Sequence, residues 1–211
     1  DGYAVVPIYD CLSEKGFSIN PDMLSAYESY FSDKEMVVPL YGGGLVPEYE
    51  EVTATDDPHE FDLDTLAGLN ADYNSSYASY NDAAIVVVGR PAGENDVYLP
   101  GTDGLADGIS TVTDNILSLS DEEMEIVNEA KANFDTVIVL INSCTPLEVS
   151  MIQANEGVDA ILNIGEGGDN GFQALGKILC GEINPSGRTP DTWAVDFTQN
   201  PSYQIFNTRT S

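Results

Sequence analysis

The sequence predicts a doubly wound α/β fold built around a parallel sheet, and two observations carry the prediction. Three apolar runs, at residues 84–88, 136–141 and 158–164, do not alternate apolar with polar side chains. Such runs are typical of parallel strands that are buried on both faces. Helical patterns alternate with the runs along the chain. Alternating strands and helices favour a parallel sheet with helices packed against it.

The N-terminal part predicts an ambiguous segment, a short strand and a helix. Residues 4–16 fit either a strand or a helix that ends at Gly16, because Val5 and Val6 favour a strand while the later residues resemble a helix with a glycine C-cap. We expect a short edge strand at 17–19. Asn20 and Pro21 then provide an N-cap and a first helical residue for a helix that continues to about residue 31.

The middle of the chain is mostly predicted to be loop. A glycine triplet at 42–44 interrupts the pattern, and eight acidic residues without a Lys or Arg fall between residues 48 and 64. Their spacing does not match an EF-hand loop, so an exposed loop is favoured over a calcium site. Residues 63–80 have weak helical character.

The C-terminal half is the most regular. Ser120 and Glu123 form a capping-box pattern that opens a helix to about residue 133. A turn or short helix is expected around 146–153, and a further helix at about 170–180. The glycines of the preceding loop, 165–171, are expected to allow positive φ and close packing rather than to bind phosphate, because the loop carries Glu166 and Asp169 but no Lys or Arg.

Composition limits the classes of function. The 211 residues are enough for one large domain or two small ones. A formal net charge of −29 disfavours nucleic acids and anionic membrane surfaces as partners, and no apolar stretch is long enough to cross a membrane. A single histidine, His59, and three widely spaced cysteines predict no metal site and no disulfide framework. We expect Cys144 and Cys180 to be small core residues.

Polar residues follow the predicted strands. Parallel strands end at one edge of their sheet, which is where such folds bind ligands. Glu94 lies six residues after the first run, and Arg90 and Asp96 lie close to it in sequence. These groups either share a polar site or lie on separate solvated loop tips, depending on strand order. Because glycoside hydrolysis needs two carboxylates and no metal, thiol or histidine, acid chemistry on sugars fits this set, with Glu94 as the candidate acid.

Residues 81–193 resemble the second domain of family 3 glycoside hydrolases, the β-glucosidase and β-xylosidase group. The matching segments, in the order of that family, are AIVVVGRPAGEND, LSLSDEEMEIV, TVIVLINSCTPLEV and VDAILNIGEGGDNGFQALGKILCGEINPSGRTPDTW. The upstream segment LSEKGFSINPDMLSAY also matches and favours a helix over residues 4–16. The resemblance implies a three-layer α/β sandwich.

The resemblance also implies a role in a retaining, two-step hydrolysis of terminal β-glycosidic bonds. The R-x-x-G-E pattern of the family falls on Arg90, Gly93 and Glu94, so Glu94 takes the acid/base role. Arg90 and Asp96 are expected to contribute to binding of a β-linked saccharide, and no cofactor is implied. The nucleophilic aspartate of the family lies on a separate (β/α)-barrel domain. We therefore expect residues 1–211 to be a single domain of a larger enzyme, inactive without its barrel.

Two other functions remain open at this point. The chain resembles the family less closely at Cys144 and at Glu166–Gly167, which weakens any assignment to those two loops. A non-catalytic carbohydrate-binding or interdomain structural module of the same fold is the main alternative. A flavodoxin-like cofactor binder is disfavoured by the lack of basic residues in the strand-end loops. The strong acidity favours, weakly, an extracellular or cell-surface location.

Overall fold

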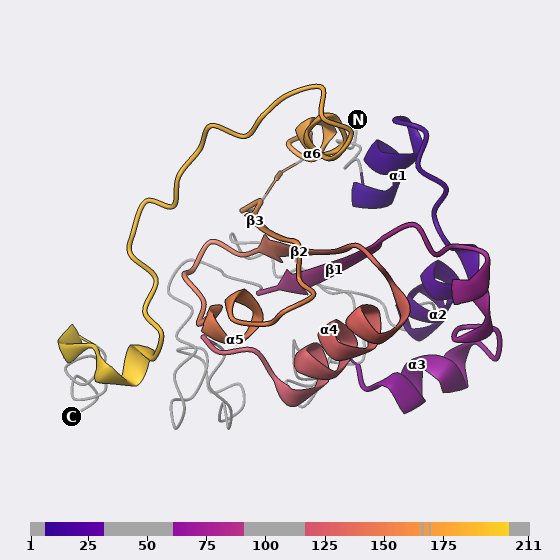
Figure 1. Ribbon diagram of the computed structural model, residues 1–211, viewed down its shortest axis with the longest axis horizontal. Coiled ribbons are helices and arrows are strands. Elements are labelled where there is room, and N and C mark those ends of the chain that lie inside the picture. Colours follow the sequence, from indigo (N-terminus) through magenta and orange to yellow (C-terminus); the bar gives the residue numbers. More distant parts are fainter. Residues whose placement is uncertain (1–6, 32–60, 91–116, 166, 169, 203–211) are drawn as a thin grey trace, which may run out of the picture.

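Three parallel strands form the sheet at the centre of the computed structural model, which describes residues 7–31, 61–90, 117–165, 167–168 and 170–202 (Figure 1). The strands are β1 (Ala84–Gly89), β2 (Val137–Asn142) and β3 (Ala160–Asn163), and they lie in the order β1-β2-β3. Both pairings are parallel. The parallel sheet that the three apolar runs predict is confirmed.

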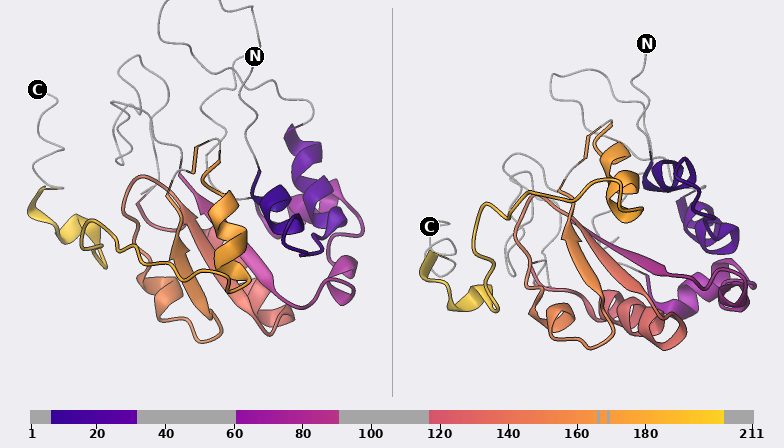
Figure 2. Two further views of the ribbon diagram at one scale, coloured as in Figure 1. Left: turned by 90° about the horizontal axis from the view of Figure 1, so that it is seen from above. Right: turned by 45° about the horizontal axis from the view of Figure 1, so that its top comes forward.

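Helices cover the sheet in two layers, so the predicted α/β sandwich is confirmed. Views from three directions place one pair of helices on one face of the sheet and a second pair on the other, with a further pair beside β1 (Figures 1 and 2). These pairs are α4 (Asp121–Asn133) with α5 (Ser150–Gln153), α1 (Ile8–Ser13) with α6 (Gln173–Leu179), and α2 (Pro21–Phe31) with α3 (Leu63–Leu69).

The two faces of the sheet differ in how completely they are buried. On the face toward α4, strand residues and helix residues form one apolar core, which includes Val86, Val88, Val139, Ile141, Ile126 and Val127. On the opposite face, Leu140 is fully buried, but its neighbour on β1, Val87, is 37% exposed. The side chains of β1 therefore face a packed core on one side and partly solvent on the other.

Local capping explains where two of the helices begin. The hydroxyl of Ser120 accepts a hydrogen bond from the Glu123 amide at 3.1 Å, and the Glu123 carboxylate accepts one from the Ser120 amide at 2.9 Å. This is the predicted capping box. The Asn20 side chain accepts a hydrogen bond from the Asp22 amide at 3.1 Å, so the predicted N-cap of α2 is also confirmed.

Several predicted elements differ from the structure. The strand expected at 17–19 is absent, because the Phe17 amide bonds to the Leu12 carbonyl and completes the turn after α1 instead of joining a sheet. Gly16, at φ +90°, closes that turn. The weak helical pattern of 63–80 corresponds to α3 and a short 3₁₀ helix, Ser75–Ala78, and α6 begins at Gln173 rather than near residue 170.

The cysteines also correct a prediction. Cys144 and Cys180 are exposed, whereas Cys11 is buried. Cys144 follows the end of β2 and Cys180 follows the end of α6. Both thiols therefore lie just beyond the apolar elements that pack into the core. Residues 48–60, including His59, lie outside the described part of the chain. Within the described part, no helix has the length and apolar character needed to span a membrane.

Candidate functional site at the carboxyl edge of the sheet

The carboxyl ends of the three strands lie side by side, as the sequence predicts. Gly89 at the end of β1 pairs with Asn142 at the end of β2, and Ile141 of β2 pairs with Asn163 at the end of β3. The Arg90 amide continues the ladder with a 3.1 Å hydrogen bond to the Asn142 carbonyl. The loops that leave β1, β2 and β3 therefore start from one edge of the sheet, where α/β proteins bind ligands.

Arg90 is buried at this edge rather than presented to solvent. Its residue is 3% exposed, and its guanidinium makes a bidentate ion pair with the carboxylate of Glu123, which is also 3% exposed. The Nη1–Oε1 and Nη2–Oε2 distances are 2.5 and 2.7 Å. The two terminal nitrogens also donate to the carbonyl oxygens of Gly89, at 2.7 Å, and Ser118, at 2.8 Å.

The loop after β2 is fixed by its own polar groups. The buried Ser143 hydroxyl accepts a hydrogen bond from the Thr145 amide at 3.0 Å and donates one to the Thr145 carbonyl at 2.9 Å. Further along, the Glu148 amide donates to the Leu117 carbonyl at 2.7 Å, and the Glu148 carboxylate accepts from the Phe197 amide at 2.6 Å. These contacts join the loop after β2 to the residues that precede α4 and to the C-terminal segment.

Glycines shape the described part of the loop after β3. Gly165 and Gly168 have φ values of +57° and +54°, as the glycine pattern predicts. A Cβ atom on Gly171 would collide with the Gly167 carbonyl, whose oxygen accepts a 2.7 Å hydrogen bond from the Gly171 amide. The two acidic residues of this loop, Glu166 and Asp169, are outside the described part of the chain.

Glu94 and Asp96, the predicted acid/base and substrate-binding residues, also lie outside the described residues. Their roles therefore stay predictions. A direct role of Arg90 in substrate binding stays a prediction too, and the burial of its guanidinium does not favour it. The sequence predicts Glu123 only as a capping residue. The signal for its second role is the Arg90 side chain itself, because a buried guanidinium requires a carboxylate partner.

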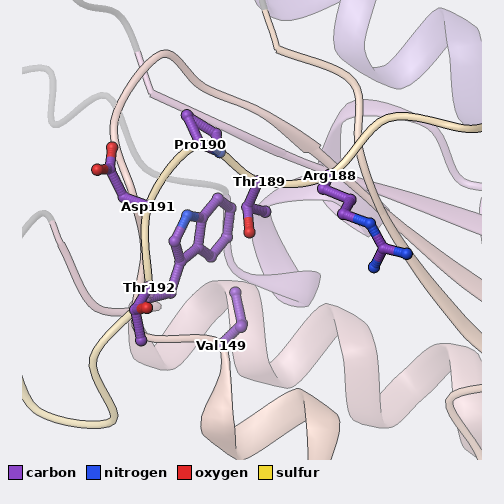
Figure 3. Close-up of a pocket in the computed structure, with 7 residues that line it drawn as sticks. Val149, Arg188, Thr189, Pro190, Asp191 and Thr192 are labelled. Atoms are coloured by element: carbon purple, nitrogen blue, oxygen red, sulfur yellow. The ribbon is translucent and has the colours of Figure 1, made fainter.

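A shallow hollow lies at the C-terminal segment. It encloses about 560 Å³ and is lined by Val149 and residues 188–193. Trp193 packs against the apolar core. The side chains of Arg188 and Asp191 point in different directions (Figure 3). The charged groups therefore do not converge on one point in the hollow. Among the described residues, no three His, Cys, Asp or Glu side chains are grouped closely enough to hold a metal ion.

Comparison with known proteins assigns the family. The chain is 29% identical over 205 residues to a β-glucosidase of Ruminococcus albus, which covers 97% of this chain and 19% of that protein. It is 33% identical over 129 residues to thermostable β-glucosidase B of Acetivibrio thermocellus, covering 61% of this chain and 15% of that protein. It is 32% identical over 128 residues to β-xylosidase/α-L-arabinofuranosidase 1 of Medicago sativa subsp. varia, covering 60% and 15%.

These relatives are much longer than this chain, which spans less than a fifth of each of them. The family match, in contrast, covers almost the whole chain: residues 16–210 match the domain described as the glycosyl hydrolase family 3 C-terminal domain. The parallel sheet between two helical layers agrees with that assignment. The chain therefore belongs to the family of glycosyl hydrolase family 3 C-terminal domains.

Proposed function

We propose that this chain is the second domain of a retaining β-glycosidase and that Glu94 is its general acid/base. The observation that carries the proposal is the position of Glu94 in the chain. It lies four residues after Arg90, and Arg90 is held at the carboxyl edge of the sheet by backbone and side-chain hydrogen bonds. An extended chain of four residues reaches at most about 14 Å, and this short separation from Arg90 supports a role for Glu94 near this edge.

In the proposed reaction, the barrel domain supplies an aspartate that attacks the anomeric carbon of a β-linked saccharide. The Glu94 carboxyl donates its proton to the leaving oxygen, and the resulting carboxylate then removes a proton from the water that releases the sugar. Retention of configuration requires the two carboxyl groups to lie about 5–5.5 Å apart. Asp96, two residues further on, is proposed to bind sugar hydroxyls.

The test uses the complete polypeptide that contains this chain. Glu94→Ala and Glu94→Gln are expected to lower kcat/KM for substrates with poor leaving groups by about 10²–10⁴-fold. An activated aryl glycoside needs little protonation of its leaving group, so its kcat/KM should fall much less. Azide should restore turnover of the Glu94→Ala variant, because an anionic nucleophile needs no base to attack the glycosyl-enzyme intermediate.

Glu156→Gln is the matched control, because Glu156 is exposed and precedes β3, at the amino edge of the sheet. It removes the same charge and should leave all rates unchanged. The chain 1–211 alone should hydrolyse aryl β-glycosides negligibly, because the nucleophile would belong to the barrel. Unchanged kinetics of both Glu94 variants in an active enzyme would reject the acid/base role. A complete polypeptide that binds saccharides without hydrolysing them would instead support the non-catalytic alternative.

A further inference from the structure

The buried ion pair joins two parts of the chain that are distant in sequence. Arg90 directly precedes residues 91–116, and Leu117 and Ser118 directly follow them. The guanidinium of Arg90 donates to the Ser118 carbonyl at 2.8 Å and to Glu123, in the first turn of α4, at 2.5 and 2.7 Å. One side chain therefore holds together the two ends of the segment that contains Glu94.

Both members of the pair are themselves fixed. The Arg90 amide belongs to the β1–β2 ladder through the Asn142 carbonyl. The Glu123 carboxylate also accepts a hydrogen bond from the Ser120 amide, at 2.9 Å, as part of the capping box. Because one partner is locked to the sheet and the other to the start of α4, the pair cannot shift without breaking several hydrogen bonds.

An ion pair is not the most stabilising choice for a buried position. The side chains of Arg90 and Glu123 are 1% and 4% exposed, so the desolvation of two charges offsets much of their attraction. Apolar side chains of the same size would often hold such a place equally well. What the pair adds is direction, because a planar guanidinium that meets a carboxylate through two parallel hydrogen bonds fixes the angle as well as the distance.

We propose that Arg90 and Glu123 are positioning residues that set where the Glu94 carboxyl is delivered. The inference rests on the acid/base role proposed for Glu94. Glu94 follows Arg90 by four residues in the sequence, and the inference is that the placement of Arg90 influences the placement of the acid. A misplacement of about 1 Å in a catalytic group can lower the rate by about 10²-fold.

The experiment compares two variants with a matched control in the complete polypeptide. Arg90→Lys keeps the positive charge but loses the bidentate geometry, and Glu123→Gln keeps the shape but loses the negative charge. Glu122→Gln is the control, because it removes the same charge from the same turn of α4, and Glu122 is only partly buried. Each enzyme is assayed with one substrate that has a poor leaving group and one activated aryl glycoside.

We expect Arg90→Lys and Glu123→Gln to lower kcat/KM by about 10–100-fold for the substrate with the poor leaving group. For the activated substrate, kcat/KM should fall by about threefold or less. Azide should raise turnover of both variants, as it should for Glu94→Ala. In the background of Glu94→Gln, adding Arg90→Lys should change the rate on the poor leaving group by less than about threefold, because two residues that act through one step are not additive. Glu122→Gln should resemble the unaltered enzyme.

If the role were purely structural, the variants would lower kcat/KM equally for both substrates, and the effect of Arg90→Lys would add fully to that of Glu94→Gln. Either result overturns the inference. If Glu123→Gln fails to fold, Arg90→Lys with and without Glu94→Gln decides the question. Failure of the acid/base proposal gives a different result from failure of the positioning role. In that case Glu94→Gln alone would leave kcat/KM unchanged for the substrate with the poor leaving group. A selective loss for Glu94→Gln without any selective loss for Arg90→Lys overturns only the positioning role.

Discussion

Neighbouring residues of β1 provide a sharp test of the packing. Val88 is 1% exposed and faces the core under α4, whereas Val87 is 37% exposed on the opposite face. Val88→Ala removes two fully buried carbons, which costs about 1.6 kcal/mol at about 0.8 kcal/mol for each CH₂ group. The cavity left behind brings the expected loss to about 2–3 kcal/mol. Val87→Ala removes two partly solvated carbons without leaving a buried cavity, so we expect a loss of about 1 kcal/mol.

The comparison isolates burial, because both variants make the same change in the middle of the same strand. Loss of β-propensity is similar at the two positions and largely cancels in the difference. The remaining difference of about 1–2 kcal/mol corresponds to a factor of about 5–30 in the unfolding equilibrium.

Urea denaturation of the purified chain 1–211 provides the measurement. Trp193 is the only tryptophan and packs against the core, so its fluorescence reports on the folded state. Far-ultraviolet circular dichroism is a second probe, and coincident transitions are required before a free energy is extracted. Equal losses for the two variants, or a larger loss for Val87→Ala, would refute the reasoning, because the face of the sheet around Val87 would then be covered in the folded chain.

Two further predictions concern thiols and an exposed ion pair. Burial raises the pKa of the Cys11 thiol, so iodoacetamide should label Cys144 and Cys180 well before Cys11. Peptide mass spectrometry measures the labelling of each cysteine, and equal labelling would contradict the packing of α1. A hydrogen bond from Lys15 lowers the pKa of the Glu182 carboxyl. This contact joins the segments that follow α1 and α6. Its stabilising effect should be fully present above the ordinary glutamate pKa and lost as the pH falls through the lowered value. Carboxyl NMR titration should show the Glu182 pKa rising in Lys15→Met, and an unchanged pKa would rule out the pair.

The two ion pairs described here have different consequences. Lys15–Glu182 joins partly exposed side chains, and solvent screening limits what it adds to stability. Arg90–Glu123 is almost fully buried, so removal of one partner leaves an uncompensated charge in the core and should cost about 3–5 kcal/mol. Thermal stability should therefore be measured for every Arg90 and Glu123 variant, so that a selective kinetic effect is not confused with loss of folded protein.

Local patterns determined many of the elements. The Ser120–Glu123 capping box, the Asn20 N-cap and the apolar runs each depend on residues that are close in sequence, and each is found as predicted. The prediction of a strand at 17–19 is wrong. A strand exists only if a neighbouring strand accepts its hydrogen bonds, and the Phe17 amide bonds instead to the preceding helix.

The candidate site shows the same division. The sequence places polar residues after strands, and the parallel direction of the strands brings those strand ends to one edge. It does not reveal that Arg90 is turned inward, because its partner Glu123 is 33 residues away. The prediction that Cys144 and Cys180 lie in the core is wrong. Apolar neighbours in sequence do not establish where a side chain points once a strand or helix has ended.

By itself, the sequence determined the class of fold, because periodicity, capping and turn residues act over a few positions and are written directly in the chain. Its resemblance to family 3 glycoside hydrolases indicated the family. Only the tertiary structure decided which face of β1 is covered, how the strands align, and that Arg90 and Glu123 form one buried unit. Those outcomes depend on which distant residues are brought together and on the desolvation of their charges, and both are properties of the packed molecule rather than of any local segment.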